Sequence, residues 1–334
     1  MERAAVTLVI PAYNAARFLP KVIPAALAAA HGQRVLVVDP GSTDDTAGIA
    51  RRLGAEVLCL GHRAGPALAR NRGVESVTTE VVLFIDSDCV AHADVVERVE
   101  RAFASDPSLV SITGSYDDTP PEQNFASLYM NLRHHFVHQG ARTEGASFWA
   151  GCGAVRTRVF REIGGFDAEQ FPAPMIEDIE LGVRLRPRGR TALDPALHVT
   201  HLKHWTLGGV IRADIFARAV PWGRLILRTG EMPNDLNLAW PQRVAAALSP
   251  FALLGLASAP VAAALGAQVI AGVALLPVAA SVALHWPMLR FFRRAKGLGF
   301  ALGGWLFHQV HLTYSAATMA VLVVERAVRP ASAT

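Results

Sequence analysis

Residues 81–85, Val-Val-Leu-Phe-Ile, form an unbroken apolar run that leads directly into Asp86-Ser87-Asp88. A short run of this kind is typical of a strand buried on both faces of a parallel sheet. In an open α/β sheet, ligands bind at the carboxyl ends of the strands. Two carboxylates there favour Mg²⁺ or Mn²⁺, ions that usually arrive with phosphate oxygens. Taken alone, the pattern fits equally well a helix N-cap at Asp86 and a solvated loop residue at Asp88.

Three further apolar runs precede this one and alternate with helix-like segments. Short loops between strand and helix indicate right-handed crossovers and a Rossmann-like, mostly parallel sheet. We expect Asn14 to cap the first helix, which runs to about residue 31, and a hydroxyl in 41–45 to cap the second, which ends near residue 53. Asp39 should share a crevice with Asp86. The remaining expected elements are strands at 6–10, 35–39 and 56–60 and a helix at 65–77.

Six sequence blocks together resemble the family 2 glycosyltransferases of the GT-A fold, in their membrane-anchored bacterial form. They occur in the family's order and span roughly residues 5–205, which makes the match far more specific than any single block. One departure is Pro40, where the family usually has a second Asp, so Asp39 is the single carboxylate of its loop. The blocks are residues 9–14, 37–46, 65–73, 86–88, 151–167 and 177–185.

The resemblance implies transfer of a sugar from a nucleotide diphosphate sugar, UDP-linked by preference, to a hydroxyl, with inversion at the anomeric carbon. Polar groups beside an apolar wall should bind the base and ribose, and a tight glycine turn at 151–153 should let the backbone approach a sugar. The residues that we expect to bind the nucleotide sugar are Pro11, Ala12, Tyr13, Asp39, Arg70, Asp86, Gly151 and Gly153.

The resemblance also assigns a metal site and a catalytic base. Asp88, with Asp86 toward the ribose and His201 as an additional ligand, would hold Mg²⁺ or Mn²⁺. Asp178 matches the family's catalytic Asp and should accept the proton of the acceptor hydroxyl, while Glu177 positions Asp178 or the acceptor. Two acids in the first turn of a helix are also what the helix dipole favours.

The other histidines receive plainer interpretations. His198 and His204 recur with His201 at every third residue, but no Cys or Asp companion completes a zinc pattern, so both are expected to be structural. Three more lie on a helix expected from about residue 122 to 139, where a surface or membrane-facing role is favoured over metal binding. These three are His134, His135 and His138.

Residues 244–289 contain no Asp, Glu, Lys or Arg. As a helix this stretch would be roughly 65–70 Å long, about twice the hydrocarbon thickness of a bilayer. We therefore expect transmembrane helices at about 244–264 and 267–287, and a third at 299–324 after the basic cluster of residues 290–296. His308 and His311 in the third segment fit interhelix hydrogen bonds better than a lipid path.

These segments predict three parts: a catalytic domain at 1–204, an amphipathic membrane-interface segment at 205–243, and a transmembrane region at 244–325. The expected transmembrane helices predict a multi-pass protein of the cell inner membrane. The first residues lead directly into strand-like sequence, so we expect the catalytic domain to be cytoplasmic. The chain is 51% hydrophobic with a net charge of +4. The sequence has no Lys/Arg run interleaved with aromatic residues, which is the pattern that would indicate nucleic-acid binding. The three cysteines lack the spacing of a metal site.

The acceptor is expected to be a lipid or lipid-linked glycan that receives a single sugar. Two alternatives stay open. A polyprenyl phosphate acceptor would already be anionic and would need no base, so Asp178→Asn would leave much of the activity. A non-catalytic membrane scaffold with a degenerate transferase domain is favoured only by Pro40, and the intact acidic residues oppose it.

Overall fold

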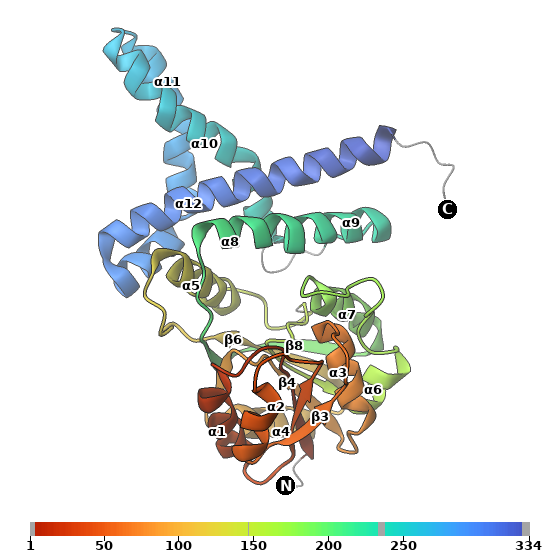
Figure 1. Ribbon diagram of the computed structural model, residues 1–334. Helices are drawn as coiled ribbons and strands as arrows, with labels where there is room; N and C mark the ends of the chain where they lie inside the picture. The colour runs from red at the N-terminus through yellow and green to blue at the C-terminus, as the bar shows by residue number, and fades with distance from the viewer. Residues whose placement is uncertain (1–3, 146, 233–237, 329–334) are drawn as a thin grey trace. The chain divides into compact units, whose positions relative to one another are not determined.

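The computed structural model describes residues 4–145, 147–232 and 238–328. The chain divides into two compact units, Met1–His204 and Trp205–Thr334. The first unit contains an 8-stranded sheet flanked by helices, and the second unit is helical in its described residues (Figure 1).

The strands of the sheet lie in the order β3-β2-β1-β4-β7-β6-β8-β5. The half formed by β3, β2, β1 and β4 is parallel, as the sequence predicts. Beyond it the sheet is mixed, because β7 is antiparallel to both β4 and β6, while β8 is parallel to β6 and antiparallel to β5. The strands are β1 Val6–Pro11, β2 Val35–Asp39, β3 Glu56–Cys59, β4 Val81–Ile85, β5 Cys89–Ala91, β6 Leu109–Tyr116, β7 Cys152–Arg156 and β8 Arg190–His201.

Alternate residues of the central strands face two separate hydrophobic cores, as the two-residue period of a strand requires. Leu83 and Ile85 of β4 join the core beneath α1, α2 and α4. Val82 and Phe84 of the same strand join the core beneath α3, α6 and α7. Both faces of β4 are therefore covered, which explains its unbroken apolar sequence. The helices are α1 Leu19–Ala30, α2 Thr46–Arg52, α3 Pro66–Glu75, α4 Val95–Ser105, α5 Phe125–Gln139, α6 Thr157–Glu162, α7 Glu177–Leu185 and the 3₁₀ helix η1 Arg186–Arg188.

Two of the predicted helix caps are wrong. Asn14 does not cap α1, which begins at Leu19; it has a φ of 49°, and its side-chain oxygen accepts a hydrogen bond from the Thr43 amide at 2.8 Å. The hydroxyls of residues 41–45 likewise do not cap α2, whose N-cap residue is Asp45; Ser42 donates to the Ala12 carbonyl at 3.4 Å and Thr43 donates to Asn14 Oδ1 at 3.2 Å. In both cases the polar side chain joins the loops after β1 and β2, where long-range contacts outcompete local capping.

Gly41 allows two neighbouring loops to approach closely. Its φ is +75°, and a Cβ there would lie 2.7 Å from the backbone carbonyl carbon of His62. Only glycine adopts this conformation and leaves that space empty without cost. The loop that follows β2, with Asp39 at its base, therefore packs directly on the loop that follows β3.

The second unit consists of successive helices with one π-helical turn. The π-helix η2 joins α8 to α9, and Gly297 breaks the regular helix of α12 with φ 84° and ψ 176°. This break lies two residues before the predicted start of the third transmembrane segment. The elements are α8 Leu207–Arg212, η2 Ala213–Ala219, α9 Val220–Thr229, α10 Trp240–Ala264, α11 Gln268–Leu284 and α12 Trp286–Val328 (Figure 1).

Among the helices of the described residues, α10 alone is long and apolar enough to cross a membrane by itself. The helices α11 and α12 pass the same test only together, as a pair bent by 67°. The 17 residues of α11 would extend about 25 Å, less than the hydrocarbon core of a typical bilayer. Three separate crossings are therefore not supported.

Buried polar side chains connect the helices of this unit. Asp214 of η2 is 2% exposed, and its Oδ2 accepts hydrogen bonds from His311 Nδ1 at 2.9 Å and from the Tyr314 hydroxyl at 2.7 Å. Ser281 of α11 donates to Gln309 of α12 at 2.8 Å. The contact of His311 is of the interhelix kind that the sequence favours.

Candidate active site

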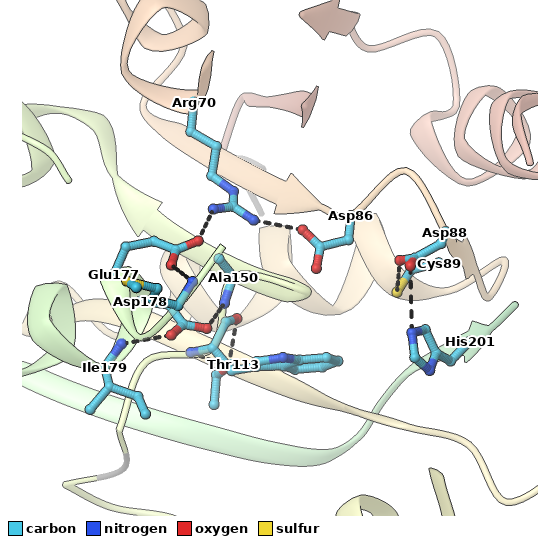
Figure 2. A network of polar contacts seen from close by, with 12 residues as sticks. Arg70, Asp86, Asp88, Cys89, Thr113, Ala150, Glu177, Asp178, Ile179 and His201 are labelled. Atoms are coloured by element: carbon cyan, nitrogen blue, oxygen red, sulfur yellow. Dashed lines mark hydrogen bonds and ion pairs between the residues drawn. The ribbon is translucent and has the colours of Figure 1, made fainter. Parts of the chain in front are cut away.

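Carboxylates and one arginine gather at the carboxyl ends of the parallel strands. Asp86 directly follows β4, Arg70 lies on α3, and Glu177 and Asp178 open α7 (Figure 2). Chain folding thus brings together groups that are up to 108 positions apart in the sequence. Their convergence at this edge of the sheet is what the strand-end rule predicts for a ligand site.

Arg70 connects the two acidic groups. Its guanidinium is 3% exposed and donates to Asp86 Oδ1 at 2.6 Å and to Glu177 Oε1 at 3.0 Å (Figure 2). The sequence predicts that Arg70 meets the base or diphosphate, whereas here both terminal nitrogens are bonded to carboxylates. A buried arginine with two acidic partners fixes their relative position, because a guanidinium presents its donors in a rigid plane. Nucleotide binding by Arg70 stays a prediction.

Asp178 is placed beside this network and is half-buried. Its Oδ1 accepts from the Ile179 amide at 2.8 Å and its Oδ2 from the Ala150 amide at 3.2 Å (Figure 2). Burial and the neighbouring charge of Glu177 raise the pKa of Asp178 to about 7, although Arg70 and the two amides work in the opposite direction. A carboxyl group with a pKa near neutrality suits proton transfer at physiological pH.

Glu177 is held more tightly than Asp178. Its Oε1 accepts from Arg70, its Oε2 accepts from the Met175 amide at 2.9 Å, and the residue is 5% exposed. These contacts hold Glu177 at the start of α7, and its expected role in positioning Asp178 stays a prediction. Its direct contact with an acceptor stays a prediction.

Asp88 and His201 meet although 113 positions separate them. Strand β5 pairs with β8 so that Cys89 lies opposite His201, and the Leu202 amide donates to the Asp88 carbonyl at 2.8 Å. His201 Nε2 consequently lies 3.6 Å from Asp88 Oδ2 (Figure 2). Burial raises the pKa of Asp88, but the hydrogen bond and charge of His201, assisted by Lys203, bring that pKa below its usual value.

Asp86 behaves in the opposite way. Burial and the charge of Asp88 raise its pKa above the ordinary value, and the ion pair with Arg70 offsets part of this effect. Asp86 and Asp88 therefore differ in environment, since Asp86 faces α3 and Asp88 faces the end of β8. The sequence could not separate them beyond the expectation that Asp86 turns toward a ribose.

The donor atoms of Asp86, Asp88 and His201 fit a divalent cation that accepts oxygen and imidazole ligands, Mn²⁺ more readily than Mg²⁺. In residues 4–145, 147–232 and 238–328, however, no three His, Cys, Asp or Glu side chains are already arranged as a metal centre. The pair of Asp88 and His201 is thus an incomplete site. A metal–diphosphate complex would supply the oxygen ligands that it lacks.

The residues expected to bind the nucleotide lie around the ends of β1 and β2. Pro11 and Ala12 are buried, and Asp39 is 6% exposed with its Oδ1 accepting from the Ser42 amide at 2.8 Å. Tyr13 is exposed, and the Arg63 guanidinium lies 5.4 Å from its ring centroid. Sequence reasoning missed Arg63; the available signal was a basic residue in the loop that follows the neighbouring strand β3.

Gly151 and Gly153 have a packing role that the sequence did not reveal. A Cβ on Gly151 would lie 2.2 Å from the Trp149 ring, and one on Gly153 would lie 2.4 Å from the Trp149 carbonyl oxygen. Gly153 belongs to β7 rather than to a turn. Both glycines make room for Trp149, and their contact with a sugar stays a prediction.

Of the histidines of α5, His138 is buried and the other two are half-buried, which corrects the expectation of a surface role for His138. His138 is 4% exposed, its Nδ1 donates to the Gly114 carbonyl at 2.9 Å, and burial lowers its pKa to about 4. His135 Nδ1 donates to the Tyr116 carbonyl at 2.8 Å. His134 stacks between aromatic neighbours, with its ring centroid 4.6 Å from that of Trp149. All three pack α5 on the end of β6 beside the site.

Comparison with known proteins agrees with this arrangement. The profile of the family described as "Glycosyl transferase family 2" matches residues 7–164, which include β1, β4, Arg70 and both acids of Asp86-Ser87-Asp88. The chain carries a family 2 glycosyltransferase domain. The matched residues thus include Arg70, Asp86 and Asp88 of the site, whereas Glu177, Asp178 and His201 lie beyond them.

One relative of the family 2 domain is the "Pre-mycofactocin glycosyltransferase" of Mycobacterium tuberculosis (strain ATCC 25618 / H37Rv). It is 31% identical over 218 residues, which are 60% of this chain and 44% of the relative. The chain therefore spans less than half the length of this curated relative.

Solved structures share the fold of the family 2 domain. "Mannosyltransferase PcManGT from Pyrobaculum calidifontis in complex with GDP-Man and Mn2+" has a TM-score of 0.60 at 20% identity and covers 96% of this chain and 88% of its own. S. aureus TarS 1-349 in complex with UDP-GlcNAc has a TM-score of 0.51 at 16% identity, with 69% and 67% coverage. These likenesses confirm the predicted GT-A fold, and both solved proteins hold a nucleotide sugar.

Proposed function

We propose that the chain is an inverting, metal-dependent glycosyltransferase that moves a single sugar from a nucleotide diphosphate sugar to a hydroxyl group. The observation that carries this proposal is the placement of Asp178, a half-buried carboxyl with a pKa of about 7, beside the Arg70-linked pair of Asp86 and Glu177. The family 2 domain and the nucleotide sugars bound by its structural neighbours support it.

The reaction needs a base on one side of the donor sugar and charge neutralisation on the other. Ionised Asp178 accepts the proton of the acceptor hydroxyl as the oxygen attacks the anomeric carbon. The bond to the nucleoside diphosphate breaks on the opposite face, which inverts the configuration. When bound, Mn²⁺ or Mg²⁺ would neutralise the charge that develops on the leaving diphosphate, held by Asp88, Asp86 and His201.

The donor is proposed to bind at the ends of β1 and β2, with Tyr13 and Asp39 at the base and ribose. UDP and GDP sugars are both candidates, since the two structural neighbours carry GDP-Man and UDP-GlcNAc. We prefer a UDP sugar, as the family resemblance implies.

The proposed acceptor is a lipid or lipid-linked glycan at the inner membrane, with the catalytic unit on the cytoplasmic side. Large apolar side chains are exposed along α10 and α11, among them Phe251, Leu254, Ile270 and Leu276, which are 60–65% exposed. Large apolar side chains exposed in this number fit hydrocarbon rather than water. A membrane acceptor would thus diffuse to the enzyme in two dimensions.

The first experiment is nucleotide release from a panel of UDP and GDP sugars, using the full chain in its own membranes. Each donor is run with Mn²⁺, with chelator, and beside Asp88→Ala. The proposal is supported if nucleotide is released from one donor and this release is lost with chelator and in Asp88→Ala. That donor then identifies the sugar. Folded protein that releases nucleotide from no donor, with membrane lipid present, would favour the scaffold.

The nature of the acceptor is tested separately with Asp178→Asn. A hydroxyl acceptor requires removal of a proton, so the variant should lose nearly all activity. A polyprenyl phosphate acceptor is anionic without a base and would retain much of it. Membrane attachment is tested by washing membranes with alkaline carbonate, which should leave the full chain in the pellet.

A further inference from the structure

Tyr116 is the last residue of β6 and carries an aromatic ring to the metal side of the site. Its ring is stacked on the imidazole of His201, with a centroid separation of 4.3 Å and an interplanar angle of 9°. The sheet creates this contact, because Tyr116 lies opposite Val199 in the parallel pairing of β6 with β8, and His201 is the next residue of β8 on the same face. Neither residue is near the other in sequence.

The Tyr116 ring is itself fixed by two other rings. The Trp149 ring meets it edge-on, with centroids 4.8 Å apart and an angle of 86°. The His134 ring lies 4.3 Å away at 39°. Aromatic pairs in these geometries attract each other beyond the effect of the area that they bury. The position of Tyr116 is therefore determined from several directions.

Helix α5 also fixes the backbone on which Tyr116 stands. Three side chains on successive turns of α5 donate to carbonyl groups at and just after the end of β6: Asn131 Nδ2 to Asp117 at 2.7 Å, His135 Nδ1 to Tyr116 at 2.8 Å, and His138 Nδ1 to Gly114 at 2.9 Å. These bonds attach the end of the strand to the helix.

His201, by contrast, has few contacts of its own that set the plane of its ring. In the described part of the chain its polar contact is the one with Asp88, 3.6 Å from Nε2 to Oδ2, and its ring contact is the stacking on Tyr116. A histidine that ligates a metal usually has its ring orientation fixed by a hydrogen bond to the second nitrogen. Stacking on a fixed aromatic ring restricts the same rotation by other means.

We propose that Tyr116 is a positioning residue that holds the His201 imidazole in the plane needed for Nε2 and Asp88 to share one divalent cation. The proposal rests on the proposed function, because it assumes that this pair binds the metal. In this proposal Tyr116 acts on the metal through His201. Its effect should therefore appear in metal affinity rather than in proton transfer.

The experiment is a Mn²⁺ titration of the full chain followed by electron paramagnetic resonance of the free ion, with UDP present and, separately, with GDP. The variants are Tyr116→Met, which fills the space without a ring face, and Tyr116→Phe, which keeps the ring. Tyr116→Leu provides a second non-aromatic side chain should the methionine variant not fold. Thermal melting without metal confirms that each variant is folded.

We expect Tyr116→Met to weaken Mn²⁺ binding by about 10-fold, the lower end of the effect of removing a residue that orients a metal ligand. Tyr116→Phe should bind as the unaltered chain does. The Mn²⁺ concentration for half-maximal activity should rise in parallel, while the rate at saturating Mn²⁺ stays within a factor of about two.

A double-mutant cycle with His201→Ala makes the test specific. If Tyr116 acts through His201, then Tyr116→Met should have no further effect on Mn²⁺ affinity in the His201→Ala background. Equal weakening in both backgrounds would overturn the proposal, as would unchanged affinity in a folded Tyr116→Met variant. If the Tyr116 proposal fails in this way but the unaltered chain binds Mn²⁺ and Asp88→Ala does not, the proposed function still stands. If the unaltered chain binds no Mn²⁺ at all, both the role of Tyr116 and the proposed metal-dependent function are overturned.

Discussion

Glu177→Gln should move the pH dependence of the reaction to lower pH. The negative charge of Glu177 contributes to raising the pKa of Asp178 to about 7. Asp178 must be ionised to accept a proton, so the rate rises as pH increases through this pKa. Without the neighbouring charge the pKa of Asp178 falls, and the rise occurs at a lower pH.

The size of the effect follows from the contacts of Glu177. A like charge within a few ångströms of a carboxyl shifts its pKa by about 1–3 pH units. The low end applies here, because the Arg70 guanidinium lies 3.0 Å from Glu177 Oε1 and cancels part of its field. At pH 6 roughly a tenth of Asp178 is ionised in the unaltered chain. A fall of about one unit in the pKa of Asp178, which corresponds to about 1.4 kcal/mol, would raise this ionised fraction to about half. The ratio of the rate at pH 6 to the rate at pH 8 should therefore rise about fivefold.

The assay is the initial rate of nucleotide release between pH 5.5 and 8.5 at saturating donor, acceptor and Mn²⁺. The absolute rate is expected to fall in Glu177→Gln, because a glutamine has one oxygen to accept from both Arg70 and the Met175 amide. The midpoint of the pH profile is the informative quantity. Glu180→Gln is the matched control, since Glu180 is 7% exposed on the same helix but pairs with Arg184.

A midpoint that stays in place or moves to higher pH in Glu177→Gln would refute the reasoning. So would an equal shift in Glu180→Gln, which would indicate a general effect of charge on the domain rather than an interaction with Asp178.

Three other substitutions test the same site and its frame. Asp178→Asn should lower the rate of transfer to a hydroxyl acceptor by about 100- to 10,000-fold in release assays, and a smaller loss would point to an acceptor that needs no base. Arg70→Met should reduce the free energy of unfolding by about 3–5 kcal/mol in denaturant titrations, because it leaves two acidic side chains without their buried partner, whereas exposed Arg72→Met should cost less than about 0.5 kcal/mol. Gly41→Ala should lower the free energy of unfolding by at least about 1 kcal/mol more than Gly61→Ala does, because both residues have a left-handed φ but only the Cβ at residue 41 would strike backbone. Equal losses of unfolding free energy in the two variants would show that the close loop contact is unimportant.

The strand ends of the site could be predicted from sequence. Asp39 ends one apolar strand and Asp86 follows another, and parallel strands end at the same edge, so the period and order of the elements were sufficient to place both residues at that edge. That they share one crevice stays a prediction. The role of Arg70 could not be predicted in this way. Its partners Asp86 and Glu177 are 16 and 107 positions away, and a helix position alone does not say which of several nearby anions an arginine will contact.

The helix caps failed for a related physical reason. Asn14 and Ser42 have side chains that can bond either to a helix N-terminus or to a neighbouring loop. The contacts between the loops after β1 and β2 decided the outcome. The histidines of α5 show the same limit, since apolar periodicity did not reveal that His138 faces the end of β6.

The sequence by itself determined the alternation of strands and helices, the burial of β4, the acids at its end and the concentration of apolar residues after residue 244, because each is a property of neighbouring residues. Only the tertiary structure decided that β7 and β5 run antiparallel, that Arg70 joins Asp86 to Glu177, and that Tyr116 stacks on His201. Those contacts depend on the register between strands that are distant in the chain, and register is fixed by the packing of the whole sheet rather than by local sequence.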